Sequence, residues 1–348
     1  MFSLLKPYIF NLDPEIAHDL AIKSLKFNFI PKTFFEVDNE DLLEVEIFKK
    51  KFKNPIGLAA GFDKSAEVYN SLFKFGFGFI EVGTVTPRRQ FGNPKPRIFR
   101  LEKDLALINR LGFNNDGLEI VKSRITNNTP KGTLGINIGP NKDTKNKGND
   151  YIECLSRIHK YADYITINIS SPNTEGLRDF HDKENFEELL SKINRYKKSK
   201  NIFKPIIVKI SPDIKEKNIS DIVELLIKHK VDGVIISNTT DKNRENIIGN
   251  NRIEKGGLSG APLKDISTKL IKKFYYDLKN KIPIIGVGGI DSGESAFEKI
   301  TAGASLVQLY TGMIYKGPTI VKEIKKELIE IFKREKIKNL KDIIGTNS

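Results

Sequence analysis

The sequence predicts an α/β fold, a closed (β/α)8 TIM barrel with a small N-terminal helical appendage. From Ile56 onward, short apolar runs alternate with longer amphipathic stretches, and there are eight such runs. Near-continuous apolar strands separated by helices indicate a parallel sheet that is covered on both faces. The count of eight favours a closed barrel over an open doubly wound sheet.

The eight runs are too short for typical helices and rich in β-branched residues, as expected for buried strands. They comprise residues 56–60, 77–82, 133–138, 164–169, 205–210, 233–237, 283–287 and 305–309. Most of the segments between them have the apolar spacing of amphipathic helices. These helices are predicted at 65–75, 115–124, 151–161, 185–197, 219–229, 263–278 and 292–302.

Polar residues and glycines gather directly after these runs. The clusters lie at 61–64, 83–86, 137, 168–173, 209–212, 237–240, 286–289 and 310–312. All follow the carboxyl ends of predicted strands, which meet at one end of a parallel barrel. This end is therefore the predicted catalytic face.

Residues 1–40 do not follow the alternation and are predicted to form the appendage, with the barrel domain at 41–348. Asp13 and Pro14 form a helix start, an N-cap followed by proline. The apolar residues of this region are Phe2, Leu4, Leu5, Tyr8, Ile9, Phe10, Leu12, Ile16, Leu20, Leu25, Phe27, Phe29, Ile30, Phe34 and Phe35. They either pack on the barrel or serve a membrane surface or a ligand tunnel. Residues 43–52 are predicted to form a hairpin that closes the lower end of the barrel.

Composition excludes several classes of protein. The net charge of +14 could attract nucleic acid or anionic lipid, but the lysines are scattered, so no nucleic-acid partner is predicted. Cys154 is the single cysteine, which rules out an internal disulfide and a CxxC metal site, and no metal is predicted. We interpret Cys154 as a core residue. The sequence contains neither an apolar run of membrane-spanning length nor a secretory signal pattern, and it suits a reducing cytosol.

Three glycine-rich segments predict a phosphate site. Residues 286–290 and 310–312 follow the seventh and eighth runs, and residues 256–260 precede the predicted helix at 263. Glycines let backbone N–H groups approach a phosphate closely. The loops after strands seven and eight are also the usual phosphate site of this barrel.

Two lysines and a set of asparagines indicate what else binds on this face. Lys64 follows an apolar run and Lys209 ends the apolar stretch 206–209. At a buried strand end a lysine either meets an anion or extends its ammonium to water. The asparagines suit a flat heterocycle with amide and carbonyl edges. They are Asn109, Asn137, Asn168, Asn173 and Asn238.

The segment 168–173 contains the candidate base. It reads as a rigid polar platform at a strand end, although an ordinary turn of serine, proline and asparagine has the same composition. The face has no obvious histidine or carboxylate base, which leaves Ser171. A serine needs neighbouring groups or a water path to pass a proton onward. Proton abstraction also needs an electron sink, and a flavin would provide one.

Six motifs resemble those of dihydroorotate dehydrogenase, closest to the quinone-dependent, membrane-associated class 2. They are AAGFDK at 59–64, EVGTVTPR at 81–88, NRLGFNN at 109–115, NISSPN at 168–173, GLSG at 257–260 and GVGGID at 286–291. The resemblance extends to DPEIAH at 13–18 and covers nearly the whole chain. It implies an FMN-containing barrel that oxidises dihydroorotate to orotate in de novo pyrimidine (UMP) biosynthesis, with a quinone as electron acceptor.

The same resemblance implies roles for individual residues. Ser171 matches the base that takes the C5 proton while hydride passes from C6 to FMN. The substrate contacts are Lys64, Asn109, Arg110, Leu111, Gly112, Phe113, Asn168, Asn173, Asn238 and Thr239. The FMN contacts are Ala60, Gly61, Lys64, Thr84, Asn137, Asn168, Lys209, Ser237, Gly260, Gly289, Tyr310 and Thr311. Ser237 stands where relatives usually have threonine.

The resemblance also implies the quinone-dependent class. The cytosolic relatives carry a cysteine base and lack the N-terminal appendage, whereas this chain has Ser171 and the appendage. His18, Arg100 and Tyr310 would then line a quinone tunnel. The implied protein is a monomer that binds the cytoplasmic side of the inner membrane peripherally through its N-terminal helices. Two alternatives remain: an FMN barrel that reduces uridine in tRNA, like dihydrouridine synthase, and a non-catalytic phosphate-binding barrel. The former class uses a catalytic cysteine on the active face.

Overall fold

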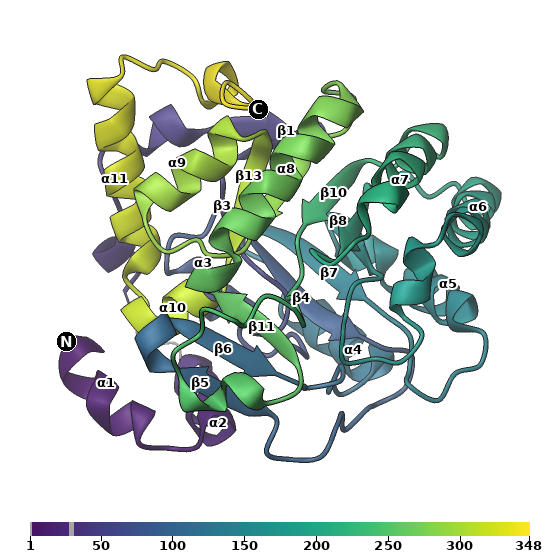
Figure 1. Cartoon of the computed structure of the whole chain (residues 1–348), viewed down its shortest axis with the longest axis horizontal. Coiled ribbons are helices and arrows are strands. Elements are labelled where there is room, and N and C mark those ends of the chain that lie inside the picture. The colour runs from purple at the N-terminus through teal and green to yellow at the C-terminus, as the bar shows by residue number, and fades with distance from the viewer. Residues whose placement is uncertain (1, 28–30) are drawn as a thin grey trace.

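The computed structural model describes residues 2–27 and 31–348 and confirms the (β/α)8 barrel. Eight parallel strands close on themselves, each paired with the next along the chain (Figure 1). They are β3 (Ile56–Leu58), β4 (Phe79–Val85), β7 (Thr133–Ile138), β8 (Tyr164–Asn168), β9 (Ile206–Ile210), β10 (Gly233–Ile236), β12 (Ile284–Val287) and β13 (Ala304–Leu309). Every predicted run overlaps one of these strands. Pairing of Val307 with Ile56 closes the barrel.

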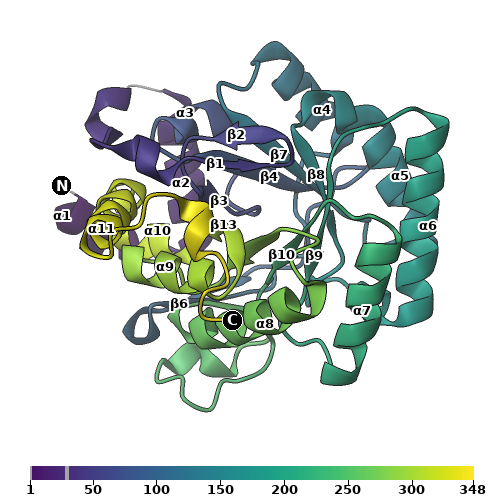
Figure 2. The same cartoon turned by 90° about the horizontal axis from the view of Figure 1, so that it is seen from above.

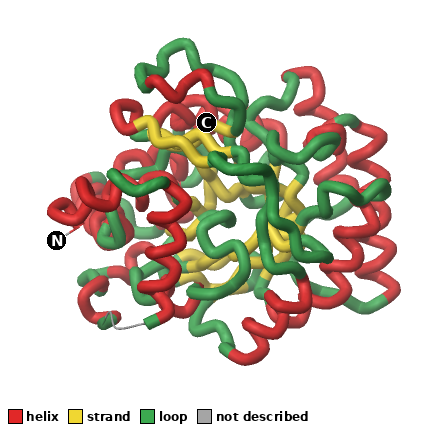
Figure 3. The backbone as a smooth tube through the Cα atoms, turned by 90° about the horizontal axis from the view of Figure 1, so that it is seen from below, coloured by secondary structure: helices red, strands yellow, loops and turns green. Residues whose placement is uncertain are grey.

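Burial explains why the runs are so apolar. All residues of β4, β7, β8 and β9 are buried, as expected for strands that face the barrel interior on one side and helices on the other. The strands lie at the centre, with the helices around them (Figures 2 and 3). Polar side chains inside the barrel are therefore tolerated only where they form hydrogen bonds with one another.

The helices that follow the strands also overlap their predictions. They are α3 (Tyr69–Phe73), α4 (Leu118–Asn127), α5 (Lys147–Ile158), α6 (Lys183–Ser199), α7 (Glu216–Lys228), α8 (Lys264–Leu278) and α9 (Gly293–Thr301). Helix α3 is shorter than predicted because the Asp63 carboxylate accepts the backbone N–H groups of Glu67 and Val68, at 2.7 and 2.8 Å. These bonds hold the start of the segment as a loop. Helices α10 (Thr311–Lys316) and α11 (Ile320–Arg334), which complete the last unit, were not predicted.

A small antiparallel sheet beside the barrel was not predicted either. It contains β5 (Ile98–Leu101), β6 (Ala106–Asn109) and β11 (Gly257–Gly260), with Ile108 paired to both Phe99 and Leu258. The pairing joins segments about 150 residues apart, which local sequence patterns do not reveal. This sheet brings Asn109 and Gly260 next to the strand ends of the barrel.

The N-terminal helices are α1 (Phe2–Phe10) and α2 (Pro14–Lys26). Asp13 caps α2 as predicted, with Oδ1 accepting the N–H groups of Glu15 and Ile16. Helix α1 has no buried residue, whereas α2 buries Glu15, Ile22 and Leu25. The predicted apolar stripe is therefore divided: Leu25 packs inward, and Ile16, Leu20 and Phe27 are exposed.

Two further expectations concern this end of the chain. No helix among residues 2–27 and 31–348 is both long and apolar enough to cross a membrane. Phe29 and Ile30 lie outside the described residues. The division of the chain at residues 40 and 41 stays a prediction.

The predicted hairpin is present as β1 (Val45–Ile47) and β2 (Lys50–Phe52). Its aromatic side chains pack on the amino-terminal ends of the barrel strands: Phe52 contacts Phe79 and Phe48 contacts Tyr164, with ring centroids 5.5 and 6.3 Å apart. The hairpin therefore closes the lower end of the barrel, as expected, and leaves the opposite end for the site.

Candidate active site

One cavity of about 390 Å³ lies at the carboxyl ends of the barrel strands. Residues at the carboxyl ends of β3, β4, β8, β9, β10, β12 and β13, or directly after them, line it, together with residues of the β5–β6–β11 sheet. Most of the predicted site residues meet there. They are Ala60, Gly61, Lys64, Thr84, Asn109, Leu111, Gly112, Phe113, Asn168, Ser171, Asn173, Lys209, Ser237, Asn238, Thr239, Gly260, Gly289, Tyr310 and Thr311.

Four predicted site residues do not line the cavity. Asn137 lies behind the wall, bonded to Thr84 and Asn168. Arg110 turns away: its guanidinium lies 2.6 Å from Glu254 and stacks over the Phe99 ring. His18 lies on α2, and Arg100 lies on β5, where it contacts the end of α1.

A buried polar network orients the floor of the cavity. Asn137 Oδ1 accepts hydrogen bonds from Thr84 Oγ1 at 2.7 Å and Asn168 Nδ2 at 3.2 Å. Its Nδ2 donates to Glu81 Oε1 at 2.8 Å, which determines which way the amide faces. The sequence reasoning missed Glu81 as a site residue, although it stands inside one of the quoted motifs.

Glu81 is a fully buried carboxylate inside the barrel. Besides Asn137, it accepts hydrogen bonds from Tyr164, Thr166 and Gln308. A buried carboxylate is tolerated when its oxygens are satisfied and a cation lies near. Lys209 is that cation, because the charge of Glu81 favours its protonated form.

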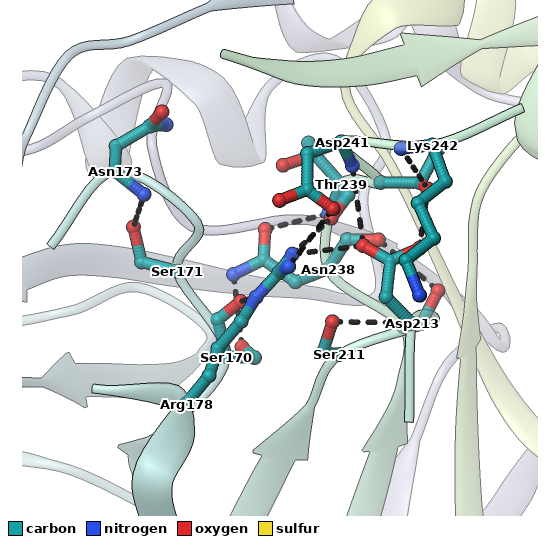
Figure 4. A network of polar contacts seen from close by, with 12 residues as sticks. Ser170, Ser171, Asn173, Arg178, Ser211, Asp213, Asn238, Thr239, Asp241 and Lys242 are labelled. Atoms are coloured by element: carbon teal, nitrogen blue, oxygen red, sulfur yellow. Dashed lines mark hydrogen bonds and ion pairs between the residues drawn. The ribbon is translucent and has the colours of Figure 1, made fainter. Parts of the chain in front are cut away.

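Ser171 is buried at the cavity wall, in a loop held from both sides. Its Oγ accepts the backbone N–H of Asn173 at 3.2 Å. The neighbouring Ser170 hydroxyl donates to Asn168 Oδ1 at 2.7 Å and accepts from Asn238 Nδ2 at 2.8 Å (Figure 4). This loop is therefore tied into the site and is not an ordinary surface turn. No carboxylate or histidine among the described residues forms a hydrogen bond to Ser171.

The two predicted lysines differ in their surroundings. Lys209 is 5% exposed, and within the described chain its ammonium has no hydrogen bond or ion pair. Burial lowers its pKa, and Glu81 opposes that shift. Lys64 Nζ lies 3.3 Å from His18 Nε2, and burial lowers its pKa to about 8. A buried ammonium that forms no ion pair fits a site that receives an electron-rich or anionic ligand.

The residues present fit a flat heterocycle that carries a phosphate. Gly260 and Gly289 have positive φ angles, and an added Cβ would lie 2.3 Å from the Leu105 carbonyl oxygen and 2.4 Å from Lys264 Cβ. Only glycine fits at these two points without displacing the neighbouring segments. Deeper in the cavity, Gln308 Oε1 is buried without a partner among the described residues. Such an orphaned acceptor suits a ligand that donates a hydrogen bond.

The cavity extends outward from Tyr310 toward α1. Its outer part is lined by Lys6, Ile98, Leu105, Leu107, Tyr315 and Lys316, which sequence reasoning did not select. Aromatic contacts connect α2 to the cavity, since His18 packs edge-on against Phe62 and Phe62 against Tyr310. Burial, followed by the charge of Lys64, lowers the pKa of His18 to about 2, so its ring is neutral.

Arg100 holds α1 against this region. Its guanidinium donates to the carbonyl oxygens of Phe10 and Leu12, at 3.0 and 2.7 Å, and lies over the Phe10 ring. These carbonyls are among those that a helix C-terminus leaves unpaired. Arg100 therefore fixes the end of α1 near the mouth of the cavity.

The geometry agrees with comparisons to known proteins. A family model described as dihydroorotate dehydrogenase matches residues 42–332. The chain belongs to this family. Among curated dihydroorotate dehydrogenases (quinone), the protein of Bartonella henselae is 49% identical and the alignment covers 96% of this chain and 92% of that relative. The protein of Idiomarina loihiensis is 46% identical, with 94% and 100% covered.

Solved structures of dihydroorotate dehydrogenase share the fold. The Eimeria tenella enzyme in complex with ferulenol is 38% identical, with a TM-score of 0.91 and 96% of both chains covered. Its ligand-free form is 39% identical, with a TM-score of 0.89 and 96% and 99% covered. These alignments cover more of the chain than the family model, which begins at residue 42.

Proposed function

We propose that this protein is a quinone-dependent dihydroorotate dehydrogenase that uses FMN and makes orotate for pyrimidine biosynthesis. The observation that carries the proposal is the single cavity that joins three features. Ser171 and Asn173 lie at one wall, the glycine segments with Gly260 and Gly289 at another, and the outer part leads to α1. A dehydrogenase with two substrates needs such an arrangement, because one site must be reached by both the donor and the acceptor.

Gly289 and Thr311 would hold the phosphate of FMN, and Thr84 and Lys209, which line the cavity, would contact its ring system. Asn137, predicted as a direct FMN contact, would act from behind the wall by fixing the hydroxyl of Thr84. The bound flavin would supply the acceptor for the hydride that leaves C6 of dihydroorotate. The charge of Glu81 favours the protonated form of Lys209 against the effect of burial on its pKa, and the ammonium would stabilise negative charge that develops next to it.

Ser171 would take the C5 proton of the substrate. The C5–H bond breaks, its proton moves to Oγ, and the hydroxyl proton of Ser171 passes to water. The N–H of Asn173, 3.2 Å from Oγ, stabilises the oxygen while it carries partial negative charge. Asn173 itself is anchored through Nδ2 to the Asn109 carbonyl oxygen at 3.0 Å. These two asparagines would therefore hold the substrate at a fixed position relative to the base.

Lys64 would bind the carboxylate of dihydroorotate or orotate. It lines the cavity, and its ammonium lies 3.3 Å from Nε2 of neutral His18. An anion in the cavity would supply the missing countercharge. Asn109, Asn173, Asn238 and Thr239 would provide the hydrogen bonds to the pyrimidine ring.

The outer part of the cavity would admit the quinone, with His18, Tyr310 and Arg100 near its path. The exposed apolar residues of α1, Leu4, Leu5 and Tyr8, would rest on the membrane from which the quinone comes. We propose peripheral association of a monomer with the cytoplasmic side of the inner membrane. Binding to vesicles of anionic lipid, and its loss when α1 is deleted, would test this part.

Two other functions fit less well. A dihydrouridine synthase-like reaction would use a cysteine on the active face, but Cys154 is buried in α5, with its thiol near the Val85 carbonyl oxygen. Burial raises the pKa of this thiol well above its usual value, so it is a poor nucleophile. A non-catalytic phosphate-binding barrel would not need Ser171, Asn173 and Lys64 together at one cavity.

The absorption spectrum of the purified protein tests the proposal. We expect a flavin spectrum that dihydroorotate bleaches without oxygen and that a quinone analogue restores. A flavin that binds but is not bleached would overturn the substrate assignment. A protein that takes up no FMN on reconstitution would overturn the cofactor assignment as well.

A further inference from the structure

Arg178 connects three loops of the catalytic face. It begins the short 3-10 helix Arg178–His181, seven residues after Ser171. Its Nε donates to the Ser170 carbonyl oxygen at 3.3 Å. Nη1 lies 3.0 Å from Asp241, and Nη2 lies 3.0 Å from Asp213 and 3.3 Å from the Thr239 carbonyl oxygen. Figure 4 shows the guanidinium between the Ser170 loop and the two carboxylates.

Asp213 makes this contact rigid. Its side chain is 4% exposed, and it also accepts hydrogen bonds from the Thr240 hydroxyl and from the Asp241 backbone N–H, the latter at 3.1 Å. Its own N–H donates to the Ser211 hydroxyl. A buried, multiply bonded carboxylate loses little side-chain freedom when it binds a guanidinium. Arg178 binds Asp213 through Nη2 and Asp241 through Nη1, so its planar guanidinium spans the two carboxylates.

The loops joined by Arg178 carry the substrate side of the cavity. The loop after β8 contributes Ser171 and Asn173, and the loop after β10 contributes Asn238 and Thr239. A second tie lies deeper, where the Ser170 hydroxyl joins Asn168 to Asn238. Arg178 itself does not line the cavity, so it acts on the reaction only through these neighbours.

The phosphate side of the cavity lies outside this network. Gly260, Gly289 and Thr311 come from β11 and from the segments that follow β12 and β13, and within the described chain none of them forms a hydrogen bond with Arg178, Asp213 or Asp241. A backbone bridge between Thr240 and Leu258 of β11 links the two sides. The outer cavity near α1 is likewise separate. A change at Arg178 should therefore affect the two half-reactions differently.

We propose that Arg178 is a positioning residue that holds the Ser171 loop and the Asn238–Thr239 loop in register for proton abstraction. The inference rests on the proposed function and adds a residue that determines its geometry. Displacing a base by about 1 Å can slow a reaction roughly 10²-fold. The contacts of Arg178 therefore control the reduction of the flavin by dihydroorotate. The reoxidation of the flavin by quinone does not depend on them.

The test compares Arg178→Lys and Arg178→Ala with wild type in both half-reactions. Arg178→Lys keeps the charge but loses the fork that spans two carboxylates and two carbonyls. We expect flavin reduction by dihydroorotate to slow about 10- to 100-fold and orotate to bind more weakly. FMN content and the rate of reoxidation by a quinone analogue should stay near wild type.

Lys183→Gln is the matched control. Its ammonium also pairs with two carboxylates, Asp221 and Glu224, but at the exposed start of α6, away from the cavity. This variant should behave like wild type in both half-reactions. Asp213→Asn should reproduce the Arg178 effect, and Asp241→Asn, at an exposed carboxylate, should have a weaker one.

Unchanged reduction in Arg178→Ala would overturn the inference, as would an equal loss in both half-reactions together with loss of FMN. If Arg178→Ala does not fold, the Lys and Asp213→Asn variants decide between these outcomes. A wild-type flavin that dihydroorotate does not reduce would instead overturn the proposed function. In that case amide hydrogen exchange still tests the role of Arg178. If Arg178 joins the two loops, residues 170–174 and 238–241 should both become less protected from exchange in Arg178→Lys.

Discussion

The barrel and the N-terminal helices use apolar residues in opposite ways. In the barrel strands, isoleucine, valine and leucine are buried on both sides, whereas α1 has no buried residue and exposes three quarters of Leu4 and Tyr8. Apolar surface that the chain does not cover itself is typical of a binding surface. The barrel buries its apolar residues within the fold, and the proposed membrane contact would cover those of α1.

Polar anchors join these two regions. Glu15 of α2 forms two hydrogen bonds with Arg97, at 2.6 and 3.0 Å, and both side chains are nearly buried. Arg97 also donates to the carbonyl oxygens of Phe91 and Asn93. Asn93 in turn donates to the Arg110 carbonyl oxygen, so α2 is connected to the loops at the mouth of the site.

The largest expected effect concerns the barrel face alone. Ser171→Ala should slow flavin reduction by dihydroorotate about 10²-fold or more, the usual cost of losing a general base. FMN should stay bound, because Ser171 lies on a different loop of the cavity from Gly289 and Thr311. Anaerobic rapid-mixing absorbance measures both. Reduction at the wild-type rate would remove Ser171 from the mechanism.

The second prediction concerns the ion pair that connects α2 to the barrel. Glu15→Gln should lower the free energy of unfolding by about 3 kcal/mol, because it leaves buried Arg97 without its main countercharge. Lys26→Gln is the control: it also ties α2 to the barrel, through Glu67, but this pair is exposed and should contribute less than about 1 kcal/mol. Urea midpoints compare the two variants, and equal shifts would contradict the prediction.

The same pair predicts a pH dependence. Burial raises the pKa of Glu15, but the hydrogen bonds and charge of Arg97 outweigh it, so the pKa lies below 4.5. A carboxylate with a lowered pKa stabilises the fold fully above the unfolded value and less as the pH falls below it. Wild type should therefore lose stability below about pH 4.5 by more than Glu15→Gln does.

A smaller effect is expected for substrate binding at high pH. Lys64 has a pKa of about 8 because burial disfavours its charge. Orotate affinity should be constant below this value and fall by up to about tenfold per pH unit above it, as the ammonium loses its proton. Titration of the flavin spectrum with orotate measures the affinity. Lys64→Gln should bind weakly at every pH, and a pH dependence that survives this change would point to another group.

The smallest effect on stability should come from α1 itself. Deleting residues 1–11 removes a helix without buried residues and keeps the Glu15–Arg97 pair. Flavin reduction and the urea midpoint should stay close to wild type, while reoxidation by a quinone should slow. Deleting residues 1–40 is a poorer test, because it also removes Phe35 from the core and Glu40 from buried Lys325. If deletion of residues 1–11 leaves the rate of reoxidation by quinone unchanged, α1 does not contribute to the quinone site.

The amino-acid sequence by itself determined the barrel and the contents of its catalytic face. Eight apolar segments long enough for strands but not for helices have one common way to be buried, and their ends define one face of the fold. Local patterns sufficed for Asp13 as a cap and for the hairpin at Phe52. Ser171, Lys64 and Lys209 could be selected because each follows such a segment.

Only the tertiary structure decided how these residues act. Glu81 is a site residue because Tyr164 and Gln308, 83 and 227 positions away, satisfy its carboxylate. Pairing of β6 with β11 builds a cavity wall from segments about 150 residues apart. The direction of each apolar side chain on α2, and the partners of Arg178, likewise depend on which distant elements pack beside them. Hydrophobic periodicity is a local property of the chain, whereas hydrogen-bond partners and exposure are set by contacts between distant segments.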